Sequence, residues 1–82
     1  MLTDKNRADK YRAIEGLRLK RIANLRKLQG VFGSWAELGR QTGKAASNLM
    51  AMAGPNPTKA IGEVIARDLE RALRLDAGWL DR

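Results

Sequence analysis

The side chains that could do chemistry in this sequence are almost all charged. The 82 residues include no histidine and no cysteine, so the commonest general base, the commonest zinc ligand and every thiolate ligand are missing. Hydrolases built on Ser-His-Asp or Cys-His are excluded, and so is a disulfide framework. Asp4, Asp9 and Glu15 form no acid–base pair, and no glycine cluster follows a strand as a phosphate-binding loop would. We therefore expect no enzymatic activity, no metal or other cofactor, and no small-molecule ligand.

The charge is strongly basic and unevenly spread. Sixteen Lys and Arg residues stand against nine Asp and Glu, for a net charge of +7. Residues 1–29 hold nine basic and three acidic side chains, whereas residues 61–82 contribute −1. A basic surface of this kind binds polyanions, with nucleic acid first and an anionic membrane surface second. The alternative is that the charge only keeps a small helical protein in solution.

The chain is long enough for one domain with a single core. No apolar run approaches the ~18–20 residues that a membrane span needs. The first residues also lack the apolar stretch of a signal peptide. We therefore expect a soluble, cytoplasmic protein with no role at a membrane.

Helical periodicity runs through almost the whole chain, and no segment alternates in the way that a strand does. The first helix is expected from about Asp9 to Gln29, after a flexible tail at residues 1–8. Gly16 weakens its middle, so the segment is either one helix or two. Its apolar stripe is formed by Tyr11, Ile14, Leu17, Ile22, Leu25 and Leu28. The predicted fold is an all-α, compact helical bundle that starts with a basic helix, a single domain over residues 9–82.

Two short helices are expected at about residues 34–53. The first is introduced by a capping box, in which the Ser34 hydroxyl accepts from the Glu37 amide and the Glu37 carboxylate reaches back. This helix ends at Gly43, and the next, Ala45–Ala53, follows almost at once.

A fourth helix is expected from about Gly62 to Leu75. Its apolar stripe repeats every four residues, and Glu63 with Arg67 and Glu70 with Arg74 form pairs that we expect on the solvated face. The apolar residues that follow, Trp79 and Leu80, are expected to pack on the core.

Short helices joined by a glycine-containing turn, in a basic all-helical domain, are typical of a helix-turn-helix. The motif needs a small residue where the helices cross, a residue that tolerates positive φ in the turn, and an apolar anchor in the second helix. Gly39, Gly43 and Leu49 supply these three in the expected order, with Leu38 and Met52 packing beside them.

At residues 35–43, WAELGRQTG, and 44–52, KAASNLMAM, the chain resembles the scaffold and recognition helices of the lambda-repressor-like family of phage and bacterial repressors. Residues 61–70, IGEVIARDLE, and 78–81, GWLD, are similar to its closing helices. The resemblance covers about residues 18–82. It implies about five helices, with the third in the major groove of double-stranded DNA, and a homodimer on a two-fold site in a bacterial cell.

The resemblance also implies which residues contact DNA. Positions that read bases fall on Lys44, Ala46, Ser47, Asn48, Met50 and Ala51. Positions for phosphate contacts fall on Ser34, Trp35, Arg40, Asn56, Thr58 and Lys59. The Trp35 indole either lies against a sugar-phosphate strand or covers the core.

The recognition helix departs from the family pattern, since it is largely alanine and methionine and offers no Arg–guanine contact. Sequence preference is therefore expected to depend more than usual on DNA shape. The alternative function keeps the fold and uses the Ala/Met helix to bind a protein partner, as an adaptor or an antitoxin-like protein.

Overall fold

The computed structural model describes the backbone of residues 4–82 and the side chains of residues 14–82, and this part of the chain contains helices and no strand. The elements are α1 (Asp4–Phe32), α2 (Trp35–Thr42), α3 (Ala46–Ala53), α4 (Glu63–Ala72) and a 3-10 turn, η1 (Trp79–Asp81). The predicted all-α class is confirmed. The described chain holds four α-helices rather than about five, and α4 is shorter at both ends than predicted.

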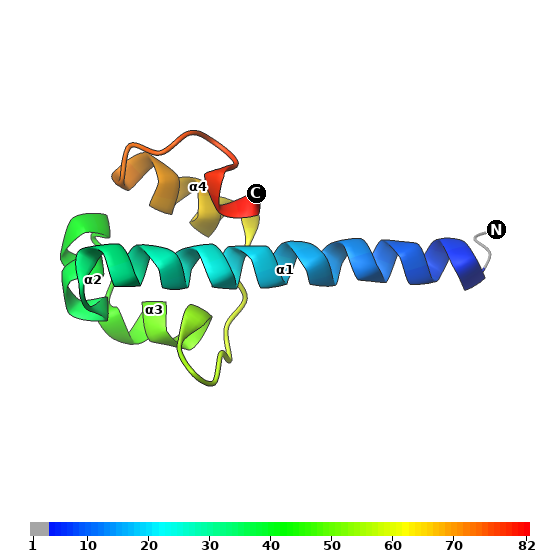
Figure 1. The fold of residues 1–82 in the computed structure, drawn as a ribbon, viewed down its shortest axis with the longest axis horizontal. Helices are drawn as coiled ribbons and strands as arrows, with labels where there is room; N and C mark the ends of the chain where they lie inside the picture. The colour runs from blue at the N-terminus through cyan, green and yellow to red at the C-terminus, as the bar shows by residue number, and fades with distance from the viewer. Residues whose placement is uncertain (1–3) are drawn as a thin grey trace.

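The first element, α1, is one continuous helix along the longest axis of the molecule (Figure 1). It begins at Asp4, so the predicted flexible tail is helical from residue 4 onward, and residues 1–3 of that tail lie outside the described chain. Gly16 does not interrupt it, because one helical glycine costs only about 1 kcal/mol relative to alanine. The helix ends at Phe32, where Gly33 takes φ 95° and donates its amide to the Gln29 carbonyl at 2.8 Å.

Only the C-terminal part of α1 packs against the other helices. In Figure 1, α2 and α3 gather at this end, α4 and η1 lie above it, and the N-terminal part projects beyond them. Leu25 and Leu28 are buried as predicted, whereas Ile14 of the same predicted stripe is 57% exposed, because no other described element covers it. The side chain of Tyr11 lies outside the described set. The rest of the core is Ile22, Leu38, Leu49, Met52, Ala53, Ile61, Ala66, Leu69 and Leu80.

A buried arginine of α1 joins η1 and the start of α4 to this helix. Arg21 is 6% exposed and donates to the Asp81 carboxylate at 2.6 and 3.2 Å, to Glu63 at 2.7 Å and to the Ile61 carbonyl at 3.0 Å. These bonds offset the cost of burying the guanidinium. The hydrogen bond from Arg21, with a further one from Arg67, lowers the pKa of Asp81 below its ordinary value. Glu63 also pairs with Arg67 at 3.4 Å, as predicted.

Glu70 lies in the interior and not, as predicted, on a solvated face. Its side chain is 1% exposed and accepts hydrogen bonds from the amides of Gly78 at 3.0 Å and Leu80 at 2.8 Å. The expected partner, Arg74, follows the end of α4 with a left-handed φ of 58°, so the helical spacing of the pair is lost. Arg67 donates to the Glu70 carboxylate instead, at 3.2 Å. The carboxylate therefore holds the segment before and within η1 against α4.

Candidate nucleic-acid interface

The crossing of α2 and α3 depends on a glycine. A Cβ placed on Gly39 would lie 2.6 Å from the Lys44 carbonyl oxygen and 3.4 Å from the Ala46 nitrogen, so the backbones meet at a distance that no side chain permits. In the turn, Gly43 takes φ 72° and donates its amide to the Gly39 carbonyl at 2.8 Å. Leu49 of α3 is fully buried. The geometry predicted for Gly39, Gly43 and Leu49 is therefore confirmed.

The capping box at the start of α2 is only half formed. The Glu37 amide donates to the Ser34 hydroxyl oxygen at 3.0 Å, as predicted. The Glu37 carboxylate does not reach back, because it accepts from Gln41 at 3.1 Å and Arg40 at 3.2 Å on the next turn. The bond from Gln41 and the charge of Arg40 lower the pKa of Glu37. Arg40, a predicted phosphate contact, is thus exposed and paired with a carboxylate at the surface, where solvent weakens the attraction.

The outward face of α3 carries both polar and apolar side chains and no charge. Ser47, Asn48 and Met50 are exposed, and Ala46 and Ala51 are half-buried on the same side, so the five predicted base-reading positions on this helix all reach the surface. Hydroxyl and amide groups donate and accept hydrogen bonds, and the methyl and thioether groups offer apolar contacts. This face can therefore exchange a few hydrogen bonds with a partner and match apolar groups around them.

The sixth predicted base-reading residue lies in the turn before α3 and not on the helix. Lys44 is half-buried, and its Nζ atom lies 3.9 Å from an Asp68 carboxylate oxygen of α4. Ala45 is the N-cap of α3, one residue before the helix begins, and its side chain gives no hydrogen bond. The first turn of α3 contains no acidic residue, so no side chain of α3 neutralises the partial positive charge at the N-terminal end of this helix.

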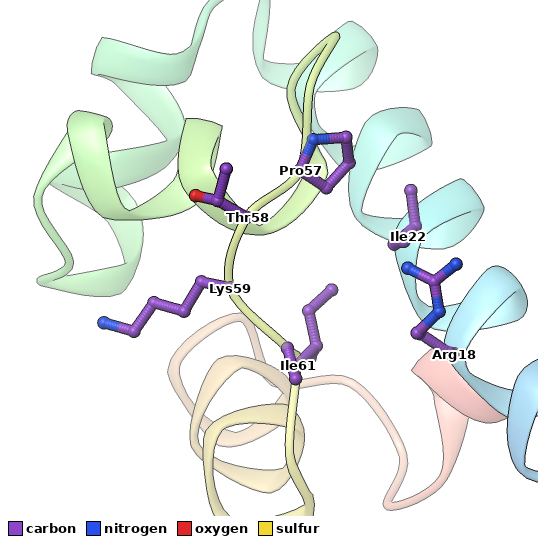
Figure 2. A pocket seen from close by; sticks show the side chains of 7 residues that line it. Arg18, Ile22, Pro57, Thr58, Lys59 and Ile61 are labelled. Carbon is purple, nitrogen blue, oxygen red and sulfur yellow. The ribbon is translucent and has the colours of Figure 1, made fainter.

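The segment after α3 is fastened to that helix by its backbone. The amides of Thr58 and Lys59 both donate to the Ala51 carbonyl, at 2.8 and 3.0 Å. The Thr58 and Lys59 side chains project from this segment on the side away from α1 (Figure 2), and both are exposed, as is Asn56. No described acidic side chain forms an ion pair with Lys59. The three predicted phosphate-contact residues of this segment are thus brought beside α3.

Arg26 of α1 was not predicted to have a role in this region. Its Nε atom donates to the Ala53 carbonyl at 2.8 Å and its Nη2 atom to the Gly54 carbonyl at 2.9 Å. It thereby caps the C-terminal end of α3, whose last turn contains no basic residue of its own. The absence of a basic residue there was the one signal in the sequence that a cation from elsewhere was needed.

Trp35 lies at the opposite end of α3 from Ser47 and Asn48. Its indole is half-buried and packs against the core, and it lines an open surface pocket of about 470 Å³ together with Arg26, Ala53 and Pro55. The structure therefore places Trp35 near the C-terminal end of α3, away from Ser47 and Asn48. Covering the core, one of the two interpretations of Trp35, agrees with this packing.

Three further observations concern the helices, the surface charge and the similarity of the chain to known proteins. Among the described residues, no helix is long and apolar enough to cross a membrane. Six of the seven described acidic side chains form ion pairs, which leaves the surplus of positive charge at the surface on residues such as Lys20, Lys27 and Lys59. Comparisons of the chain with protein-family models, with curated proteins and with solved structures found no match.

Proposed function

We propose that the protein binds double-stranded DNA through α3 and acts as a transcriptional regulator, a repressor of phage or prophage type in the bacterial cytoplasm. The observation that supports this best is the close crossing at Gly39 and Gly43, which fixes α3 across α2 with Ser47, Asn48 and Met50 outward. An α-helix with its side chains is about 10–12 Å across, and the major groove of B-DNA is ≈ 12 Å wide, so a helix such as α3 fits into it. In this proposal α2 and α3 act as a helix-turn-helix, with α3 as the recognition helix.

In this proposal α3 reads DNA with few hydrogen bonds. Ser47 and Asn48 bond to base edges, while the methyl groups of Ala46 and Ala51 and the Met50 side chain contact thymine methyl groups. No arginine on α3 can form the two-bond contact with guanine. Part of the sequence preference therefore comes from the shape and deformability of the duplex.

The backbone of the DNA is held by residues around α3. Lys59, Thr58 and Asn56 lie next to α3. The ion pair of Arg40 with Glu37 is exposed, so Arg40 can leave Glu37 and bind a phosphate. Each phosphate neutralised gives a slope of about −0.9 in a plot of log affinity against log salt concentration. A homodimer, which we include in the proposal, places two copies of α3 on half-sites about one helical turn apart.

Selection from short random duplexes by the purified protein at near-physiological salt tests this function. We expect a two-fold motif with fixed half-site spacing. The double variant Ser47→Ala with Asn48→Ala should lose most of the preference at the positions that it reads, about 1–3 kcal/mol per base contact. Val64→Ala, a change to an exposed side chain of α4, is the control and should keep the motif. No enrichment by the wild-type protein would overturn the proposal.

One observation favours a second candidate, a module that binds a protein partner. Met50 is 45% exposed in the middle of an uncharged, alanine-rich face, and methionine suits adaptable apolar contacts. Met50→Lys separates the two functions. The added charge should strengthen DNA binding if α3 lies in a groove, whereas it should abolish a complex in which Met50 is buried against a protein.

A further inference from the structure

A second surface feature lies on the other side of the segment that carries Lys59. A pocket of about 180 Å³ opens between α1 and residues 57–61. Figure 2 shows the Ile61 side chain directed toward α1, with Arg18 and Ile22 facing it from that helix and Pro57 beside them. Ile22 and Ile61 belong to the buried core, so the floor of the pocket is apolar and fixed.

Arg18, the cation at this pocket, uses only part of its hydrogen-bonding capacity. Arg18 donates its Nε and Nη2 atoms to Glu15, at 3.2 and 2.7 Å. A guanidinium carries five N–H donors, so three of them are left for another oxyanion. The Arg18 side chain is 47% exposed, and solvent strongly screens an ion pair at this exposure. Binding a second anion therefore requires no costly rearrangement.

The chemistry of the pocket fits one unit of a sugar-phosphate backbone. A phosphate on Arg18 leaves its sugar against Ile22, Pro57 and Ile61, which match the apolar face of a deoxyribose. A volume of about 180 Å³ is small for a site that must enclose a whole small molecule, since such sites span ≈ 300–1,000 Å³. A polymer needs only to rest one unit there, because its neighbouring units bind elsewhere.

The position of the pocket favours the same occupant. Residues 57–61 separate it from α3, and the amides of Thr58 and Lys59 hold this segment to Ala51. The Lys59 side chain points to the α3 side and Arg18 lies on the other side, so the two cations stand on either side of one segment (Figure 2). A DNA strand that leaves α3 along this segment meets Lys59 first and then Arg18.

We propose that the pocket between α1 and residues 57–61 is a subsite for one phosphate and deoxyribose of the DNA backbone, with Arg18 as the phosphate ligand. This inference rests on the proposed function and extends the contact surface from α3 to α1. Glu15 competes with DNA for Arg18 and so weakens binding.

Salt-dependent binding of a selected duplex tests the subsite. Arg18→Gln should reduce the magnitude of the salt slope by about 0.9 and weaken binding about eightfold at 0.1 M salt, with the preferred sequence unchanged. Glu15→Gln should strengthen binding. The matched control is Lys20→Gln, which removes the same charge from an exposed position two residues further along α1, about 200° around the helix from Arg18; it should leave the slope unchanged. Thermal melting checks that each variant is folded.

The outcomes separate this inference from the function on which it rests. If the wild-type protein binds no duplex, both are overturned. If the wild type binds DNA and Arg18→Gln keeps the wild-type slope, the subsite is overturned and the proposed function stands. Equal losses in Arg18→Gln and Lys20→Gln would show a general effect of net charge and would also overturn the subsite.

Discussion

Replacing Gly39 by alanine should destabilise the protein, although alanine is the better helix former. The change gains about 1 kcal/mol of helix propensity in α2. The new Cβ lies 2.6 Å from the Lys44 carbonyl oxygen, a backbone atom of a tight turn that cannot rotate away. Overpacking of this kind costs typically about 1–3 kcal/mol, and a contact this short with backbone belongs at the upper end. The net loss should be about 2 kcal/mol.

Gly30→Ala is the matched control, because Gly30 also lies in a helix and a Cβ there meets nothing within 4 Å. This variant should gain up to about 1 kcal/mol, so the two substitutions differ by about 3 kcal/mol. Thermal unfolding followed by circular dichroism measures the difference, since 1 kcal/mol shifts the Tm by about 4–8 °C in a domain of this size. Gly39→Ala should melt about 8–16 °C below the wild type. A Tm equal to that of Gly30→Ala would refute the close crossing of α2 and α3.

Three other changes have expected outcomes that follow from the polar contacts. The lowered pKa of Asp81 contributes stability that is fully present above its ordinary pKa of 3.8 and is lost as the pH falls through the lowered value. In urea unfolding between pH 7 and pH 2, Asp81→Asn should therefore lose less stability on acidification than the wild type. An unchanged pH profile would contradict the role of Arg21. Glu70→Ala should lower the free energy of unfolding, measured by chemical denaturation, by about 3–5 kcal/mol, because it leaves buried partners unpaired. Glu63→Gln, on the exposed side of the same network, should lower it by at most about 1 kcal/mol. Equal losses in the two variants would place Glu70 at the surface. Arg26→Met should lower the free energy of unfolding by about 1–3 kcal/mol, because it removes two hydrogen bonds to the end of α3. Hydrogen exchange of the α3 amides should become faster. An unchanged exchange rate would argue against the cap.

The local features were predictable from the sequence, and the long-range ones were not. Gly39, Gly43 and Leu49 are constrained by neighbours only a few residues away, and their spacing alone predicts how they pack. Ile14 continues an apolar stripe, but nothing local says where the covering helices stop. Glu70 looks like a surface residue by helical spacing, and only the return of η1 to α4 makes it a buried acceptor. These two errors arise because burial depends on contacts between distant parts of the chain.

Arg26 was missed for the same reason. Its partners at the end of α3 are 27 and 28 residues away, and a basic residue on a basic helix gives no local sign of a particular role. The common position of Asn56, Thr58 and Lys59 beside α3 was easier to predict, because the three residues share one short segment. Their association with α3 follows from chain connectivity, and the backbone bonds to Ala51 then fix it.

The bonds from Arg21 and Asn24 to η1 also set the order in which a newly made chain can fold on the ribosome. Arg21 reaches Asp81 across 60 residues, and Asn24 reaches the Leu80 carbonyl across 56. The partners of α1 in α2 and α3 emerge from the exit tunnel well before residue 79. A nascent chain can therefore form α1, α2 and α3 early, but Arg21, Asn24 and Glu70 lack the partners that η1 supplies until η1 appears. Closure of the core around η1 therefore follows the formation of those helices, and until then water must satisfy these groups.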